Sequence, residues 1–206
     1  MKTKEPGASV EPKPSPKPSA RDRLLAAADD LFYSEGVHVV GVDRIVERAG
    51  VTKATLYNTF GSKEDLVRAY LEQHMRRRQR RIARILEAND TPRKRILGIF
   101  AEVEGLLAES QFRGCRFINA AAEARPGDAS EVASEEYRGW LLSIFADLAE
   151  AAGARDAKQL ARQLLLLYDG AAVAARMDDD RRGAAIATGS GVVALLEAAI
   201  PVRRSR

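Results

Sequence analysis

The chain has 206 residues, a net charge of +4 and a sequence pI near 9.3. Its length allows one large domain or two small ones, and the modest positive excess is compatible with an anionic partner without establishing one. A single cysteine excludes an internal disulfide and favours a reducing compartment, no apolar run could span a bilayer, and no signal-peptide core is present, so we expect a cytoplasmic protein without membrane association.

Residues 1–18 form a leader in which prolines alternate with lysine, serine and glutamate. A segment with so little apolar surface to bury is expected to be disordered or extended. Two roles are open for it. Lys13 and Lys17, with Arg21 and Arg23, could reach DNA phosphates or a neighbouring minor groove. The alternative is a solvated leader with no role in binding.

A first helix is predicted from Ala20 to Glu35. Ser19 and Asp22 have the spacing of a capping box, in which each side chain satisfies a free backbone N–H of the other. The helix has one apolar face and ends near Gly36. The apolar residues are Leu24, Leu25, Ala28, Leu31 and Phe32.

The stretch from Val40 to Leu66 predicts two short helices joined by a tight turn. The first begins after Gly41, and Gly50 can end it in a left-handed conformation that other residues adopt at a cost. Thr52 can cap the second, which runs from Lys53 to about Phe60. The first helix has one apolar face, made of Val42, Ile45, Val46 and Ala49. After Gly61, Ser62 opens a further helix, with Asp65 as its capping partner.

The second short helix has two predicted faces, of which the outward face suits DNA. The inward residues are Ala54, Leu56 and Phe60. The outward residues are Lys53, Thr55, Tyr57 and Asn58, with Thr52 at the helix start. Lysine binds phosphate, asparagine pairs with adenine edges, and threonine contacts a thymine methyl or a phosphate. Arg44 and Lys63 are expected to bind phosphates too. The alternative is an ordinary solvated helix.

The segment AGVTKATLYNTFGSKEDL resembles the recognition segment of the tetracycline-repressor (TetR) family, which typically reads AGV-[ST]-K-x-T-[LI]-Y-x-[HY]-F-x-[ST]-K-x-x-L. The resemblance implies a three-helix DNA-binding domain, a helical effector-binding and dimerising domain, and repression of transcription. Two positions depart from the family pattern. Gly41 stands where Ser or Thr is frequent, and Thr59 where His or Tyr is common, so one DNA contact at each position is in doubt.

The remaining chain predicts helices only, so the expected fold is all-α. A long helix from Lys63 to about Glu87 carries His74 and Arg78 on the same side as its apolar residues, and should link the two domains mechanically. Further helices are expected near 92–107, from Ser130, over 155–177 and over 181–200, around a small-residue segment RGCRFINAAAEA. The predicted division is a leader at 1–18, a DNA-binding domain at 19–66 and an effector-binding and dimerising domain at 67–206.

Six arginines between residues 76 and 84 have two interpretations. They could form a nucleic-acid patch, but a helix rise of about 1.5 Å per residue carries them away from the proposed reading helix. A solvated face with ion pairs to nearby glutamates is the better interpretation. The residues are Arg76, Arg77, Arg78, Arg80, Arg81 and Arg84.

The last two helices predict a homodimer. Residues 164–168 are apolar around most of a helix, and small residues at 171–175 and 183–191 permit close helix approach. One side can cover the protomer's own core while the other meets a twofold mate in a four-helix interface. The alternative is a monomer with a thick core. The residues predicted at the interface are Leu164, Leu167, Ala171, Ala175, Val192 and Leu196. A dimer would read a palindromic operator in double-stranded DNA.

An effector pocket is expected among the middle helices. Its predicted residues are His74, Phe100, Cys115, Phe117, Asn119, Trp140 and Tyr168. Each has an ordinary structural role as its alternative. Cys115, between Arg113 and Arg116, could have a lowered pKa and sense oxidants or electrophiles, although a buried inert thiol is the simpler interpretation. The family resemblance implies a small, largely apolar effector of unknown identity, whose binding would release the operator.

Other functional classes have weaker support. A carboxylate-bridged metal enzyme needs paired Glu-x-x-His motifs, and only Glu35 with His38 has that spacing. Nucleophilic catalysis lacks an elbow motif. An architectural DNA binder would lack the large apolar second domain. We therefore predict a ligand-responsive repressor with no catalytic residues, metal or cofactor. A transcriptional activator and a helical ligand-binding protein without sequence-specific DNA binding remain as alternatives.

Overall fold

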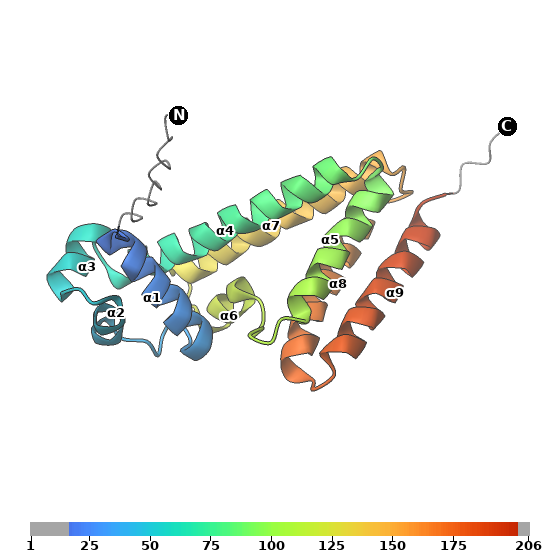
Figure 1. The fold of residues 1–206 in the computed structure, drawn as a ribbon. Coiled ribbons are helices and arrows are strands. Elements are labelled where there is room, and N and C mark those ends of the chain that lie inside the picture. Colours follow the sequence, from blue (N-terminus) through green and yellow to red (C-terminus); the bar gives the residue numbers. More distant parts are fainter. Residues whose placement is uncertain (1–16, 202–206) are drawn as a thin grey trace, which may run out of the picture.

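The computed structural model describes residues 17–201, and within that range it contains nine helices and no strand (Figure 1). The helices are α1 (Ala20–Glu35), α2 (Val42–Ala49), α3 (Lys53–Phe60), α4 (Lys63–Ala88), α5 (Pro92–Leu107), α6 (Arg116–Glu123), α7 (Ala129–Ala151), α8 (Ala157–Met177) and α9 (Arg181–Ala199). The predicted all-α fold is confirmed. Almost all of the predicted leader at 1–18 lies outside the described residues, and so does the suggested role of Lys13. None of the described helices is both long and apolar enough to cross a membrane.

Local capping chemistry explains where the helices begin. Ser19 accepts a hydrogen bond from the Asp22 N–H at 3.1 Å, and the Asp22 carboxylate accepts one from the Ser19 N–H, which completes the predicted capping box. The hydroxyls of Thr52, Ser62 and Thr91 cap α3, α4 and α5 in the same way. Each cap satisfies N–H groups that a helix start otherwise leaves free.

Helices α1, α2 and α3 form a small unit at one end of the molecule, which we call the head (Figure 1). In the head, α1 packs against α2, α3 and the first turns of α4. Its core side chains are fully or almost fully buried, and they include Leu24, Ile45, Leu56 and Leu66. Because these residues come from all four helices, the head presents α3 at a fixed angle.

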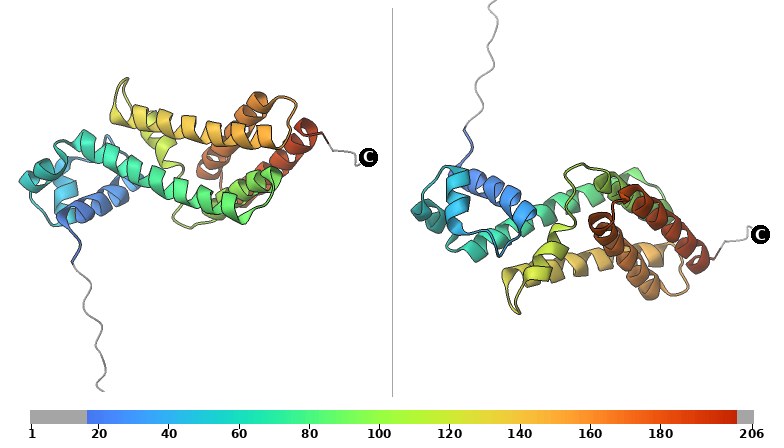
Figure 2. Two further views of the ribbon diagram at one scale, coloured as in Figure 1. Left: turned by 90° about the horizontal axis from the view of Figure 1, so that it is seen from above. Right: turned by 90° about the horizontal axis from the view of Figure 1, so that it is seen from below.

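Helix α4 leaves the head and continues into a larger unit, the body, made of the rest of α4 and α5–α9 (Figures 1 and 2). In the body, α7 packs against α4, α6 and α8, and α9 packs against α5 and α8. The predicted division at residue 66 falls inside the first turns of the continuous α4, and it stays a prediction. A movement of α4 would therefore displace residues in both the head and the body.

Candidate nucleic-acid interface and effector cavity

The turn between α2 and α3 has the geometry of a helix-turn-helix. Gly50 has φ 62° and ψ 44°, the left-handed conformation that ends α2. The N–H of Val51 donates to the carbonyl of Val46 at 3.0 Å, which holds the turn against the end of α2. The Thr52 hydroxyl then accepts from the Thr55 N–H at 3.1 Å and starts α3. This turn fixes the angle between the two short helices.

Helix α3 is anchored on one side and open on the other. Leu56 is fully buried, and Phe60 is partly buried under the guanidinium of Arg21, 5.3 Å from the ring centroid. The open side exposes Lys53, Asn58 and Tyr57, whose side chain is 48% exposed. A helix anchored in this way can enter a major groove without losing its own packing.

Two residues of α3 differ from the predicted faces. Ala54 was expected to face inward, but it is exposed. Thr55 was expected to face outward, but it is half-buried, and its hydroxyl lies 2.9 Å from that of Thr52. In this short helix Leu56 fills the core position, and the small side chain of Ala54 stays outside that core.

Two of the predicted phosphate contacts, Lys53 and Arg44, are paired with carboxylates. Lys53 Nζ lies 2.6 Å from Asp43, which raises the pKa of Lys53 above its usual range. Arg44 pairs with Glu35 in the same exposed region. Since both pairs are exposed, water screens them and phosphates can replace the carboxylates. Lys63 is half-buried, and its burial lowers its pKa, so it is the least accessible of the predicted phosphate contacts.

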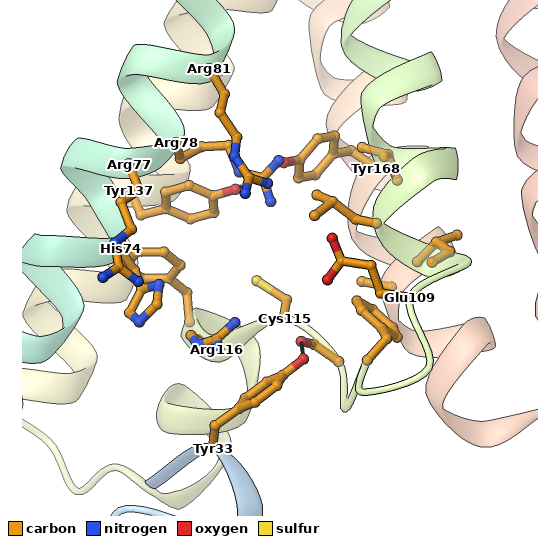
Figure 3. Close-up of a pocket in the computed structure, with 17 residues that line it drawn as sticks. Tyr33, His74, Arg77, Arg78, Arg81, Glu109, Cys115, Arg116, Tyr137 and Tyr168 are labelled. Atoms are coloured by element: carbon orange, nitrogen blue, oxygen red, sulfur yellow. Dashed lines mark hydrogen bonds between the residues drawn. The ribbon is translucent and has the colours of Figure 1, made fainter. Parts of the chain in front are cut away.

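A cavity of about 230 Å³ lies in the body, and Tyr33 of the head is one of its lining residues (Figure 3). Four of the predicted effector residues line it, namely His74, Cys115, Phe117 and Tyr168. Phe100, Asn119 and Trp140 do not. Phe100 packs in the core against Phe145 and Tyr168. Asn119 binds the backbone of Arg113 and the side chain of Arg176, and Trp140 packs beside Tyr137.

The cavity is more polar than predicted. Three arginines of α4 line it, together with Arg116, Tyr33, Tyr137 and Glu109. The α4 arginines are Arg77, Arg78 and Arg81. Sequence reasoning had assigned them to a solvated face, and they do form ion pairs, with Asp29 and Glu102. One feature of the sequence could have predicted that Arg78 points inward. Arg78 lies four residues after His74 and four before Ile82, and so on the same face of α4 as these two residues.

Asp29 of α1 holds a cluster of charges at the edge of this cavity. Its carboxylate lies 2.9 Å from His74 Nε2, 3.2 Å from Arg116 and 3.4 Å from Arg77. Burial alone would raise the pKa of Asp29, but the hydrogen bond from His74 and the charges of His74 and Arg116 outweigh it and hold that pKa at about 2. Burial lowers the pKa of His74. The Asp29 carboxylate therefore joins the head to α4 and α6.

Cys115 lies in the middle of the cavity (Figure 3). Burial raises the pKa of its thiol, in contrast to the lowered pKa considered from its arginine neighbours. A raised pKa reduces the thiolate fraction, on which reactivity toward oxidants and electrophiles depends. The structure thus favours the inert thiol over the sensor.

The segment before α6, and α6 itself, connect the cavity to the head. The Tyr33 hydroxyl of α1 accepts from the Arg113 N–H at 2.7 Å and donates to the Gly114 carbonyl at 3.1 Å. At the other end of α6, Glu123 accepts from the His38 N–H at 2.8 Å. Gly36 leaves the room for this contact, since a Cβ there would lie 2.5 Å from Glu123 Oε1. A change in the cavity wall can therefore reach the α1–α2 connection.

Five of the six residues predicted at the dimer interface are buried within the single protomer. Leu164, Ala171, Ala175, Val192 and Leu196 are buried in the protomer's own core, and only Leu167 is partly exposed. The side chains left open on the same two helices are different ones. They are Leu166, Val173 and Met177 on α8, and Ile186 and Val193 on α9. A second protomer could reach the exposed set but not the buried one.

The described part of the chain, residues 17–201, brings together no group of three or more His, Cys, Asp or Glu residues able to hold a metal ion. The Glu35 and His38 side chains form separate contacts, with Arg44 and with Asp128.

Comparisons with known proteins agree with this geometry. Residues 24–70 match the family described as "Bacterial regulatory proteins, tetR family". The crystal structure of SCO4454, a TetR-family transcriptional regulator from Streptomyces coelicolor, is 33% identical with a TM-score of 0.85, and the match covers 88% of this chain and 96% of that one.

Two curated proteins of Mycolicibacterium smegmatis are similar over the N-terminal part. The activator FasR is 43% identical over 60 residues, which are 29% of this chain and 27% of FasR. The repressor KstR2 is 32% identical over 87 residues, which are 42% of each chain. The chain therefore matches less than half the length of either of these two relatives.

Proposed function

This chain belongs to the tetracycline-repressor (TetR) family, and we propose from that premise that it is a cytoplasmic transcriptional repressor. In this proposal a homodimer binds a palindromic operator in double-stranded DNA, and a small molecule in the cavity releases it. The observation that carries the proposal is the exposed polar face of α3, held outward by the buried Leu56. The similarity to KstR2 supports repression. The similarity to FasR makes activation the second candidate, which a promoter reporter in a deletion strain would distinguish.

We propose that DNA contacts are divided between base readout and phosphate binding. Asn58, Tyr57 and Lys53 occupy the open face of α3 and would reach base edges and the nearest phosphates. The hydroxyls of Thr52 and Thr55, which bind each other in this structure, would donate hydrogen bonds to oxygens of the DNA backbone. Arg44 and Lys63 flank α3 and would add phosphate contacts.

We propose that the second protomer binds the exposed apolar residues of α8 and α9, which we call the exposed stripe. Leu166 and Val173 are seven residues apart on α8, and Ile186 and Val193 are seven apart on α9, so each pair lies along one helix face. The two helices pack against each other, and all four side chains are exposed. Exposed apolar surfaces of this kind mark interaction sites. A twofold axis through this surface would make a four-helix interface.

Effector release would use the contacts between the cavity and the head. A ligand that favours one arrangement of residues 112–116 shifts the equilibrium between head positions by its difference in affinity for them. Tyr33 and Glu123 would transmit this difference, because both bind across the boundary. The DNA-bound spacing of the two α3 helices would then be lost.

The test of the reading face starts with genomic fragments retained by the full chain. Affinity for a retained duplex is then measured for Lys53→Ala and Tyr57→Ala. Each variant should bind at least about tenfold more weakly, and Lys53→Ala should lower the slope of log affinity against log salt by about one. Lys158→Ala, an exposed lysine on α8, is the control and should bind like the wild type. Unchanged affinity in both α3 variants would refute the assignment.

A further inference from the structure

The inner wall of the cavity holds two tyrosine hydroxyls that share one hydrogen bond. Tyr137 and Tyr168 are buried, and their hydroxyl oxygens lie 3.1 Å apart beside Arg78 (Figure 3). Neither hydroxyl has a second hydrogen-bond partner among residues 17–201. Two hydroxyls carry two protons, and one bond between them uses only one. The second O–H is therefore available to an acceptor inside the cavity.

Arg78 adds further donors at the same place. Its guanidinium has five N–H groups, and its one ion pair within residues 17–201 is with Glu102, at 2.5 Å. The guanidinium carbon lies 5.9 Å from the centroid of the Tyr168 ring, and Figure 3 shows the guanidinium beside the two tyrosines. Arg78 side-chain atoms line the cavity. The donors that Glu102 leaves free thus face the same small volume as the tyrosine proton.

The charges around the cavity do not cancel. Four arginines line it, and the carboxylates that bind or face them are Asp29, Glu102 and Glu109, which leaves one positive charge. The start of α6 adds to this potential, because helix N-termini carry partial positive charge and Cys115 at the N-cap brings no carboxylate to balance it. One negative charge on a ligand would restore neutrality.

Part of the remaining lining is apolar. Val103 and Leu107 of α5, Phe112 and Phe117 form walls around the arginine and hydroxyl end. At about 230 Å³, the cavity is slightly smaller than the usual range for ligand sites, from about 300 Å³ upward. The space suits one compact apolar group with one polar end.

We propose that the effector is a small monocarboxylate with a compact apolar body, its carboxylate bound by Arg78 and the Tyr137–Tyr168 hydroxyl pair. This inference rests on the proposed effector site and specifies its ligand class. It replaces the largely apolar effector expected from the family resemblance. A neutral analogue would accept from the arginine without the attraction between opposite charges, and a cation would meet the excess positive charge. Glu109 is exposed and is the only carboxylate lining the described cavity, so it offers a cation no buried partner.

Matched ligands test the charge requirement directly. The probes are 3-phenylpropanoate, 3-phenylpropanamide and 3-phenylpropylamine, and the corresponding octyl series of octanoate, octanamide and octylamine. Binding to the full chain without DNA is measured by calorimetry, so that the result does not depend on operator binding. At least one carboxylate should bind, and about tenfold or more tightly than its amide, with the amine weakest. Equal or tighter binding of the amide or amine, or no binding by either carboxylate at millimolar concentration, would overturn the proposal.

Two double variants locate the carboxylate and are chosen to fold. Tyr137→Phe with Tyr168→Phe removes both partners of one bond. Arg78→Leu with Glu102→Leu removes both partners of one ion pair, and Arg81, which also pairs with Glu102, is 46% exposed and can be solvated instead. Each should weaken carboxylate binding by about tenfold while changing amide binding by no more than about threefold. Arg80→Leu, an exposed arginine of α4 outside the cavity, is the control and should bind both ligands like the wild type.

The outcomes separate this inference from the proposed function. Equal losses for carboxylate and amide, or no loss in either double variant, would show that the charge is not bound at this wall and would overturn the inference. Release of a retained operator duplex by the same carboxylate is measured separately. Ligand binding without operator release would contradict the proposed effector role of the cavity, but it would still support the proposed ligand class.

Discussion

At the scale of single residues, one cluster of opposite charges lies where the head meets the body. Asp29 comes from α1, His74 and Arg77 from α4, and Arg116 from α6. Such a cluster is costly to disturb, because removing one member leaves its partners with unsatisfied charges in a partly buried site. The cluster therefore couples the protonation of one carboxylate to the contact between the two units.

Replacing Asp29 with Asn should remove an acid-sensitive part of the stability. The folded-state pKa of Asp29 is about 2, below the ordinary value of about 3.9, so its stabilising contribution is present above about pH 4 and is lost as pH falls toward 2. The variant should lose about 2–3 kcal/mol of unfolding free energy at pH 6, and the difference from the wild type should shrink toward zero near pH 2.

Chemical denaturation at a series of pH values measures this difference. Asp147→Asn, an exposed carboxylate on α7, is the control and should show no comparable pH dependence. A difference between wild type and Asp29→Asn that stays constant from pH 6 to pH 2 would contradict the role given to this carboxylate.

At the scale of elements, the helix boundaries were predictable because their causes are local. Ser19, Thr52, Ser62 and Thr91 each precede a helix, and each hydroxyl forms the cap expected from its position. Gly50 likewise has the left-handed conformation expected at the end of α2. These signals need only a few neighbouring residues, so sequence alone contains them.

The role of α6 could not be predicted in this way. Its contacts to Tyr33 and His38 join residues about 80 or more positions apart in the chain. Nothing in the segment RGCRFINAAAEA indicates that its two ends bind α1 and the α1–α2 connection. Such contacts depend on the packing of the whole chain.

Tyr33→Phe should weaken the link between cavity and head without moving the ring. The variant loses the hydroxyl's two bonds, to Arg113 and Gly114, while the stacking of Arg116 on the ring, at 3.6 Å, can remain. We expect the unfolding free energy to fall by about 1–2 kcal/mol, since each net hydrogen bond contributes about 1 kcal/mol. Operator affinity without ligand should stay near that of the wild type, and its reduction by a cavity-binding carboxylate should be smaller.

The measurement is operator affinity with and without the ligand, in wild type and variant, beside a denaturation curve. Tyr57→Phe is a matched control outside the link. It should change operator affinity equally with and without the ligand, so that the ratio of the two affinities stays at the wild-type value. An unchanged ligand response in Tyr33→Phe would contradict the proposed path through residues 112–116.

At the scale of the whole molecule, the sequence predicted a dimer interface on the last two helices but could not assign the helix face that forms it. Helix α8 is apolar on nearly every side around residues 164–168, so periodicity could not decide which side meets the core. In the structure Leu164 is buried and Leu166 is 67% exposed. The cavity was missed in part for a similar reason, since an arginine on an inward helix face is visible as a cavity residue only after the helices are packed.

Charged substitutions on the exposed stripe should therefore produce monomers. Leu166→Glu and Val193→Glu would each place a charge in the proposed apolar interface, where burial without a partner is unfavourable. Both variants should keep their helical content and sediment as monomers, whereas Ala83→Glu on α4 should remain a dimer. Leu164→Ala should instead destabilise the protomer, by about 2–5 kcal/mol. Dimers in both stripe variants, or a monomeric wild type, would contradict the assigned face.

The most direct test of the central claim, that two copies of α3 read one operator, is footprinting of the wild-type protein on a retained duplex. We predict two protected half-sites related by a twofold axis, and a loss of affinity of about a hundredfold or more when one half-site is scrambled. Leu166→Glu should protect neither half-site at concentrations that saturate the wild type. A single half-site bound as tightly as the pair, or protection that Lys53→Ala and Tyr57→Ala leave unchanged, would contradict the account.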